Sequence, residues 1–148
     1  MATQHFVLLL KNQLNENKSS EKSGRDKINL FSYLTKLREI CLDPSLVVPD
    51  YTGGSSKLTV VKEIVKDASE SGKKILLFSQ FTSVLQKIEE DFKKEDISYL
   101  YLDGGTSAKD RVERVKKFNE DSNIKVFLIS LKAGGVGLNL TSASVVIH

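Results

Sequence analysis

The glycine-rich segment 130–140, Ser-Leu-Lys-Ala-Gly-Gly-Val-Gly-Leu-Asn-Leu, contains the residues best suited to binding chemistry. Glycine stands at three of the four positions from 134 to 137, where it permits positive φ and a close approach of the backbone to a ligand. Free N–H groups in such a bend can form a concave anion site, and Lys132 would add a positive charge. The segment therefore predicts a phosphate site, with a purely structural strand-to-loop connection as the alternative.

Two common phosphate-binding motifs are absent from the sequence. A dinucleotide fingerprint needs G-x-G-x-x-G, but after Gly135 and Gly137 the third glycine position is occupied by Leu140. A P-loop ends in Gly-Lys-Ser/Thr, but the Gly72-Lys73 pair is followed by Lys74. An acidic pair of the kind that binds magnesium after a strand is missing too. We therefore expect that this chain does not bind and activate ATP by itself in the usual way.

A second polar segment, Phe78-Ser-Gln-Phe-Thr82, follows a short apolar run. Hydroxyl and amide side chains at the end of a strand can contact a phosphate backbone. Helix capping by Ser79 or Thr82 is the alternative interpretation. The segment is thus a second candidate for binding phosphate groups.

The third candidate segment is Leu102-Asp-Gly-Gly-Thr106, with Arg111 one turn into the next expected helix. Asp103 is typical of a turn, whereas Thr106 and Arg111 could share one phosphate; a solvated basic helix face is the alternative. Each candidate segment follows an expected strand, and the carboxyl ends of parallel strands are where α/β sheets bind ligands. We therefore expect Ser79, Asp103 and Ser130 along one edge of a sheet.

Apolar patterning predicts the elements that would position these segments. Apolar runs predict strands at 75–78, 97–102, 126–129 and 145–147. Helical spacing predicts helices from Leu58 to a Gly72 cap, from Thr82 with an apolar side through Phe92, and after a Ser107 capping box, with a core face of Ala108, Val112, Val115 and Phe118. This alternation predicts right-handed crossovers and a mostly parallel α/β sheet.

The first third of the chain has a different pattern and predicts a separate helical segment at 1–49, followed by a domain at 50–148. Apolar helices are expected over 4–15 and 30–41, with a polar loop over 15–27 between them. The second helix should end near Asp43, because Pro44 disfavours helical geometry in the residue before it.

Composition excludes several classes of protein. The 148 residues carry a net charge of +3, too little to prove a polyanionic partner. The single cysteine, Cys41, excludes a disulfide framework and a multi-cysteine zinc site. No apolar run approaches the roughly 18 residues of a membrane span. These features predict a cytoplasmic protein with no membrane partner. The last expected strand ends beside His148, which suggests a fragment.

Taken in order, five segments resemble the second RecA-like, or helicase C-terminal, lobe of SWI/SNF-type ATP-dependent DNA translocases, a branch of the superfamily-two helicases. They are 37–46, 56–60, 75–82 (helicase motif IV), 101–111 and 126–141 (motif V, nearly residue for residue). The resemblance implies a RecA-like three-layer α/β fold with a mostly parallel sheet flanked by helices, preceded by a helical segment. The chain would end before motif VI and its arginines.

The resemblance also implies roles for particular residues. The DNA backbone would be bound by Ser79, Gln80, Thr82, Gly104, Thr106, Arg111, Ser130, Lys132, Ala133 and Gly134. The nucleotide would be faced by Gly135, Gly137, Leu138 and Asn139. The chain would contribute no catalytic residue and no metal ligand.

At the level of the whole protein, the resemblance implies a DNA-dependent ATPase that uses ATP and Mg²⁺. Its partners would be double-stranded DNA, a first RecA-like lobe that carries the P-loop and the magnesium-binding acidic box, and protein substrates on DNA. It would work in the cytoplasm, or with DNA in a nucleoid or nucleus. This chain alone would be inactive and bind no cofactor. A nucleotide-independent nucleic-acid-binding module and a small-molecule enzyme that binds a mononucleotide are the alternatives.

Overall fold

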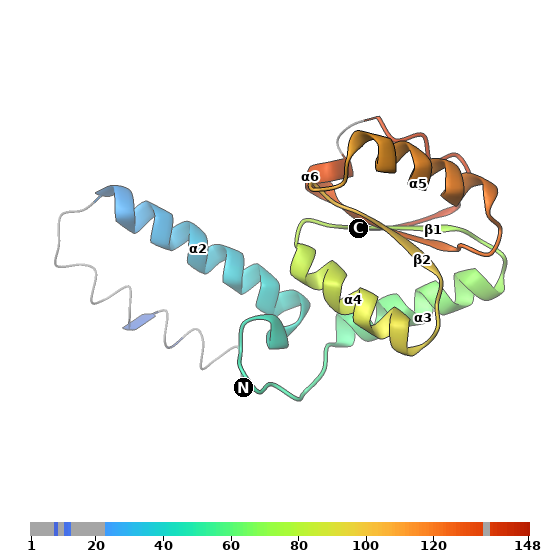
Figure 1. The fold of residues 1–148 in the computed structure, drawn as a ribbon. Coiled ribbons are helices and arrows are strands. Elements are labelled where there is room, and N and C mark those ends of the chain that lie inside the picture. The colour runs from blue at the N-terminus through green and yellow to red at the C-terminus, as the bar shows by residue number, and fades with distance from the viewer. Residues whose placement is uncertain (1–7, 9–10, 13–22, 135–136) are drawn as a thin grey trace. The chain divides into compact units, whose positions relative to one another are not determined.

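The computed structural model describes residues 8, 11, 12, 23–134 and 137–148 (Figure 1). The chain divides into two compact units, Met1–Lys57 and Leu58–His148, and each is described by itself. Most of the helix expected over 4–15 lies outside the described residues. The domain boundary expected between residues 49 and 50 stays a prediction.

The first unit contains the helix α2, Ser23–Leu42, and a short 3-10 helix, Pro44–Leu46. The end of α2 before Pro44 is as predicted, and the Asp43 carboxylate accepts the N–H of Ser45 at 2.9 Å as an N-cap of the 3-10 helix. The loop expected over 15–27 is wrong for residues 23–27, which are helical. A polar stretch has no apolar side chains to bury, which excludes a buried helix but not an exposed one. Arg25 and Lys27 are exposed on this helix.

The second unit is built on a sheet of four strands in the order β2-β3-β1-β4. The strands are β1 (Ile75–Ser79), β2 (Tyr99–Leu102), β3 (Val126–Ser130) and β4 (Val145–Ile147), and all neighbouring pairs are parallel. Every residue of β3 is buried, as expected for a continuous apolar run covered on both faces. The predicted mostly parallel α/β sheet is confirmed.

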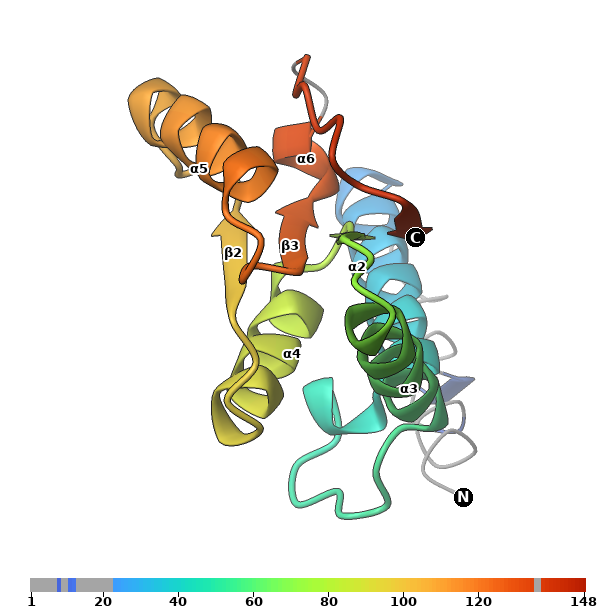
Figure 2. The ribbon, with the colours of Figure 1, turned by 90° about the vertical axis from the view of Figure 1, so that its right-hand side faces the viewer.

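Helices cover both faces of this sheet. They are α3 (Ser56–Glu70), α4 (Thr82–Lys94), α5 (Ala108–Glu120) and α6 (Leu131–Gly134). In two perpendicular views, α3 and α4 lie on one face and α5 and α6 on the other (Figures 1 and 2). The three-layer arrangement matches the expected RecA-like fold, and Gly72 has the positive φ of 73° that a left-handed cap after α3 requires.

The core between α5 and the sheet is aromatic, with ring centroids of Phe118 and Phe127 5.3 Å apart. Phe118 is fully buried, as predicted, and Val115 packs partly against the same cluster. The prediction that Ala108 and Val112 face the core is wrong, since Ala108 is exposed and Val112 is 69% exposed. Both line an open cavity that is also lined by residues 137–139.

Candidate nucleic-acid and nucleotide interface

The register of the sheet brings the three polar strand ends to one edge. Ser79 of β1 is the partner of Ser130 of β3, and Leu102 of β2 is the partner of Ile129. Asp103 follows Leu102 directly and so lies at the same edge. The predicted coincidence of the three strand ends at one edge is therefore confirmed.

In the β1–α4 connection, Ser79 makes a local contact, while Gln80 and Thr82 are exposed. The Ser79 hydroxyl accepts the N–H of Phe81 at 3.1 Å, which closes a local turn, but the helix-capping interpretation of Ser79 and Thr82 is wrong because Phe81 is the N-cap of α4. Thr82 is the first residue of α4. The N-cap residue is Phe81, whose side chain makes no hydrogen bond to the helix. The side chains available for an external phosphate are thus Gln80 and Thr82.

The turn after β2 is closed by its own side chains. The Asp103 carboxylate accepts the N–H of Gly105 at 2.9 Å, and the Thr106 hydroxyl accepts the N–H of Asp103 at 3.1 Å. The N–H of Thr106 also donates to the Asp103 carbonyl at 3.2 Å. Asp103 is therefore the turn former that the sequence predicts, and Thr106 is half-buried beside an exposed Gly104.

Arg111 connects two of the candidate segments. Its Nε donates to the carbonyl of Thr106 at 3.1 Å, and its Nη2 donates to the carbonyl of Asp103 at 3.2 Å. Its Nη1 donates to the carbonyl of Ala133 at 3.1 Å. Three of the five N–H donors of a guanidinium are thus directed at the chain itself. Arg111 therefore acts as a clamp, because its hydrogen bonds hold the turn after β2 and the helix α6 together. The sequence did not predict this role.

Residues 131–134 form the short helix α6, and part of the glycine bend expected at 134–137 lies outside the described residues. Leu131, Lys132 and Ala133 are good helix formers, and Ala133 packs in the core at 1% exposure. Ser130 is also 1% exposed, whereas Lys132 is exposed. Of these residues, Lys132 therefore has the side chain that is open to the surface. Gly135 lies outside the described residues, and Gly134 is the last residue of α6.

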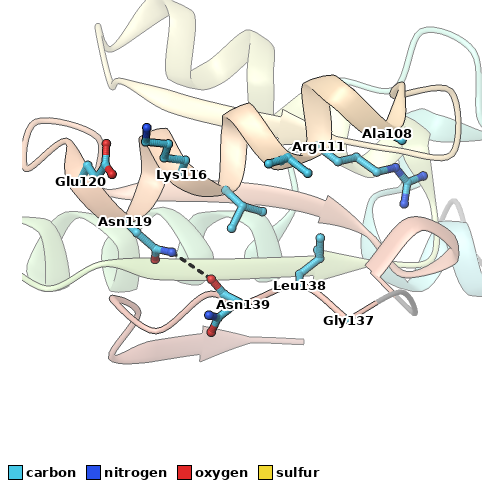
Figure 3. Close-up of a pocket in the computed structure, with 10 residues that line it drawn as sticks. Ala108, Arg111, Lys116, Asn119, Glu120, Gly137, Leu138 and Asn139 are labelled. Atoms are coloured by element: carbon cyan, nitrogen blue, oxygen red, sulfur yellow. Dashed lines mark hydrogen bonds between the residues drawn. The ribbon is translucent and has the colours of Figure 1, made fainter.

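Residues 137–139 line a cavity of about 550 Å³ with α5 (Figure 3). Gly137 has a φ of 42°, and a Cβ built there would point into open space. Leu138 points toward α5 and packs partly against the core, while Asn139 is exposed (Figure 3). The wall on α5 consists of Ala108, Arg111, Val112, Val115, Lys116, Asn119 and Glu120.

Asn119, in the wall of this cavity, forms hydrogen bonds to residues 139 and 142, a role that the sequence did not indicate. Its Nδ2 donates to the carbonyl of Asn139 at 2.9 Å (dashed line in Figure 3). Its Oδ1 accepts the N–H of Ser142 at 3.3 Å and the hydroxyl of Ser142 at 2.8 Å. In the sequence, Asn119 is distinguished only by its position eight residues after Arg111 on the same expected helix. Its partners could not be predicted because they lie 20 and 23 residues away.

The last turn of α5 is capped by Lys74, a second residue that the sequence analysis missed. Its buried ammonium donates to the carbonyl of Phe118 and, at 2.8 Å, to the carbonyl of Asp121. It also lies 4.9 Å from the centre of the Phe118 ring. Burial lowers the pKa of Lys74, and the nearby charge of Lys125 lowers it further. The carbonyls at the end of α5 are thereby satisfied from the start of β1.

The described residues offer open backbone at 137–139 but no cluster of metal ligands. The open Gly137 backbone and the exposed Asn139 leave room for a polar ligand. Across residues 8, 11, 12, 23–134 and 137–148, no group of three or more His, Cys, Asp or Glu side chains gathers as a metal site would require.

Of the helices in those residues, none has the length and apolar character needed to cross a membrane.

Comparison with known proteins places this geometry in a family. The model of the helicase conserved C-terminal domain matches residues 56–148. An uncharacterized ATP-dependent helicase of Mycoplasma pneumoniae is 40% identical over 124 residues, which are 84% of this chain and 12% of that protein. The Xenopus tropicalis SWI/SNF-related matrix-associated actin-dependent regulator of chromatin subfamily A containing DEAD/H box 1 is 36% identical over 118 residues, 80% of this chain and 11% of that protein.

Solved structures agree with the sequence relatives. The Sulfolobus solfataricus SWI2/SNF2 ATPase C-terminal domain superposes with a TM-score of 0.83 at 31% identity, over 99% of this chain and 65% of that one. The Sulfolobus solfataricus SWI2/SNF2 ATPase core in complex with dsDNA gives a TM-score of 0.80 at 30% identity, over 99% of this chain and 32% of that one. The chain spans only 11 to 12% of the length of the two relatives described above. The chain belongs to the helicase conserved C-terminal domain family, in which it is a second RecA-like lobe of the SWI/SNF type.

Proposed function

We propose that the chain is the second lobe of an ATP-dependent DNA translocase, in which it binds the sugar-phosphate backbone of duplex DNA and completes an ATP site shared with a first lobe. The observation that carries the proposal is the parallel register that places the ends of β1, β2 and β3 at one edge. A backbone phosphate ladder is a ligand long enough to contact several strand ends at once. The SWI2/SNF2 core with bound dsDNA supports this choice of ligand.

On the DNA side, the exposed side chains of Gln80, Thr82 and Lys132 would contact phosphates, and Gly104 would let the turn after β2 approach them closely. Arg111 and the buried Ser130 would support this surface from within. Contacts to phosphate and sugar carry no direct sequence information, so binding would tolerate any sequence and weaken with salt.

On the nucleotide side, Gly137, Leu138 and Asn139 would face ATP, which supplies the free energy of a step when its γ-phosphate is hydrolysed. Mg²⁺ would be bound by carboxylates of the first lobe, because the described residues of this chain gather no group of three that could hold a metal. The segment would position its exposed backbone and the Asn139 amide toward the nucleotide.

The partners would be duplex DNA, the first lobe and protein–DNA complexes on which the motor acts. The name of the Xenopus relative, a regulator of chromatin, supports the last of these. The protein would work where DNA is, in a nucleoid or a nucleus.

The test is DNA-stimulated ATP hydrolysis by the protein that carries both lobes. We expect duplex DNA to stimulate hydrolysis, and Lys132→Ala to weaken DNA binding while lowering the slope of log affinity against log salt by about one unit. Lys93→Ala is the matched control, because Lys93 is an exposed lysine in the last turn of α4. DNA binding without any DNA-stimulated hydrolysis would instead favour a nucleotide-independent binding module.

A further inference from the structure

Both halves of the segment 130–142 are hydrogen-bonded to one helix. Arg111, in the first turn of α5, bonds the carbonyl of Ala133 at 3.1 Å. Asn119, near the end of α5, bonds the carbonyl of Asn139 at 2.9 Å and both polar groups of Ser142. Their separation of eight positions corresponds to about 12 Å along a helix axis. The helix therefore restrains the segment at two well-separated points.

The helix is itself fixed to the core, so it can act as a reference for the segment. The Ser107 hydroxyl accepts the N–H of Asp110 at 3.1 Å as an N-cap, and Lys74 caps the other end. Phe118, beside Asn119, is fully buried against Phe127. A side chain of α5 that bonds the segment 130–142 therefore holds that segment at a fixed position relative to the core.

The partners of Asn119 fix the orientation of its amide. The Asn139 carbonyl can only accept a hydrogen bond, so it must face the NH₂ group of Asn119. The Ser142 N–H can only donate, so it must face the Asn119 oxygen. Aspartate has almost the same shape but would place an oxygen against the Asn139 carbonyl. The amide is thus required, and its two ends can be tested separately.

We infer that Asn119 is a positioning residue for the nucleotide site, which holds residues 139–142 against α5 while Arg111 holds the DNA-facing half of the same segment. The inference rests on the proposed function for the assignment of Asn139 to the nucleotide. Asn119 lines the same cavity as Gly137, but both ends of its amide are bonded to Asn139 and Ser142, so it would act on ATP through the backbone of this segment.

The first experiment measures the restraint in the chain 1–148, by amide hydrogen exchange. In Asn119→Ala we expect the N–H of Ser142 to exchange at least tenfold faster, while the strand β1 is unaffected. In Asn119→Asp we expect the Ser142 N–H to stay protected, because the acceptor is retained, and residues 137–139 to exchange faster. Unchanged exchange at 137–142 in both variants would overturn the inference whatever the protein's activity.

The second experiment measures the consequence in the protein with both lobes. We expect Asn119→Asp to raise the KM for ATP on the order of tenfold, because a small displacement of a positioning group is costly. DNA affinity without nucleotide should stay within twofold of wild type. Lys117→Gln is the charge-matched control, since it lowers the net charge by one from an exposed position two residues away. It should leave both values unchanged.

The outcomes separate the two proposals. A wild-type protein without DNA-stimulated hydrolysis contradicts the proposed function, and the exchange experiment still decides whether Asn119 holds the segment. An active wild type with an unchanged KM in Asn119→Asp contradicts the inference alone. A lower DNA affinity, a higher KM and a lower kcat together would indicate a structural role rather than a positioning one and would contradict the inference.

Discussion

At the scale of single residues, the side chain of Arg111 has two competing explanations. The sequence and the family resemblance predict a phosphate contact, whereas the structure shows three donors directed at carbonyls of Asp103, Thr106 and Ala133. A phosphate contact on the surface would contribute little to stability in the absence of DNA. A half-buried clamp would contribute much more, since hydrogen bonds to charged groups are stronger than neutral ones.

Arg111→Lys tests this difference. We expect the variant to lower the free energy of unfolding by about 2 kcal/mol, because one ammonium cannot replace a planar fork that reaches several carbonyls. Urea unfolding of the chain 1–148, followed by circular dichroism, measures it. Lys109→Ala is the control on the same turn, with an exposed 3.9 Å pair to Glu113 that should contribute almost nothing. Equal unfolding midpoints for wild type and Arg111→Lys would restore the phosphate-only interpretation.

Residue-scale predictions were good where the cause is local. The Asp103 turn and the Ser107 cap were predictable, because their partners lie within three residues. Asn119 and Lys74 were missed because their partners lie 20 to 47 residues away, and only the folded sheet brings them together. Arg111 was identified as important, but its carbonyl partner at Ala133 could not be predicted without the register of β2 and β3.

At the scale of elements, the four strands were predictable from their apolar runs and α6 was not. A buried run in a parallel sheet is apolar throughout and stands out from amphipathic helices. The three glycines near α6 favoured a bend, but Leu131 to Ala133 continue the chain from β3 as a helical turn, because burial of Ala133 in the core favours it. The exposed Val112 shows a related limit: apolar spacing indicates a helix face but not what that face covers.

The strand β2 gives a prediction about pH. Burial raises the pKa of Tyr99 to about 12, and its hydrogen bond to Glu89 at 2.8 Å adds to the effect. Since the folded pKa exceeds the unfolded value of 10.0, the neutral form stabilises the fold below pH 10, and this contribution is lost as pH rises through 12. The direction follows from the unfolded chain releasing its proton first.

Tyr99→Phe removes this group and allows it to be measured. We expect the variant to be less stable than wild type below pH 10, because the bond to Glu89 is lost. The difference in free energy of unfolding should then shrink steadily between pH 10 and pH 12. Lysines titrate in the same range but are common to both proteins, so they cancel in the difference. A difference that stays constant up to pH 12 would contradict the assignment.

At the scale of the whole molecule, the sheet topology explains how a chain with a modest net charge of +3 gathers its polar connections at one edge. The order β2-β3-β1-β4 places three polar connections side by side, although they are far apart in the sequence. The fold class and this common edge were predictable from alternating strands and helices. The position of α5 over the segment 137–142 was not, because it depends on packing rather than on pattern.

The proposed division of binding between two lobes leads to the last prediction, on the chain 1–148 alone. The sequence has no Gly-Lys-Ser/Thr, and the described residues gather no three-residue metal group, so titration calorimetry with ATP and Mg²⁺ should give no detectable binding. ATP hydrolysis should not exceed background. Duplex DNA should bind with an affinity that falls as salt rises and that is similar for unrelated sequences, since phosphates are the contacts. Tight ATP binding by this chain alone would mean that residues 137–139 and α5 form a complete mononucleotide site, and the shared-site proposal would then be wrong.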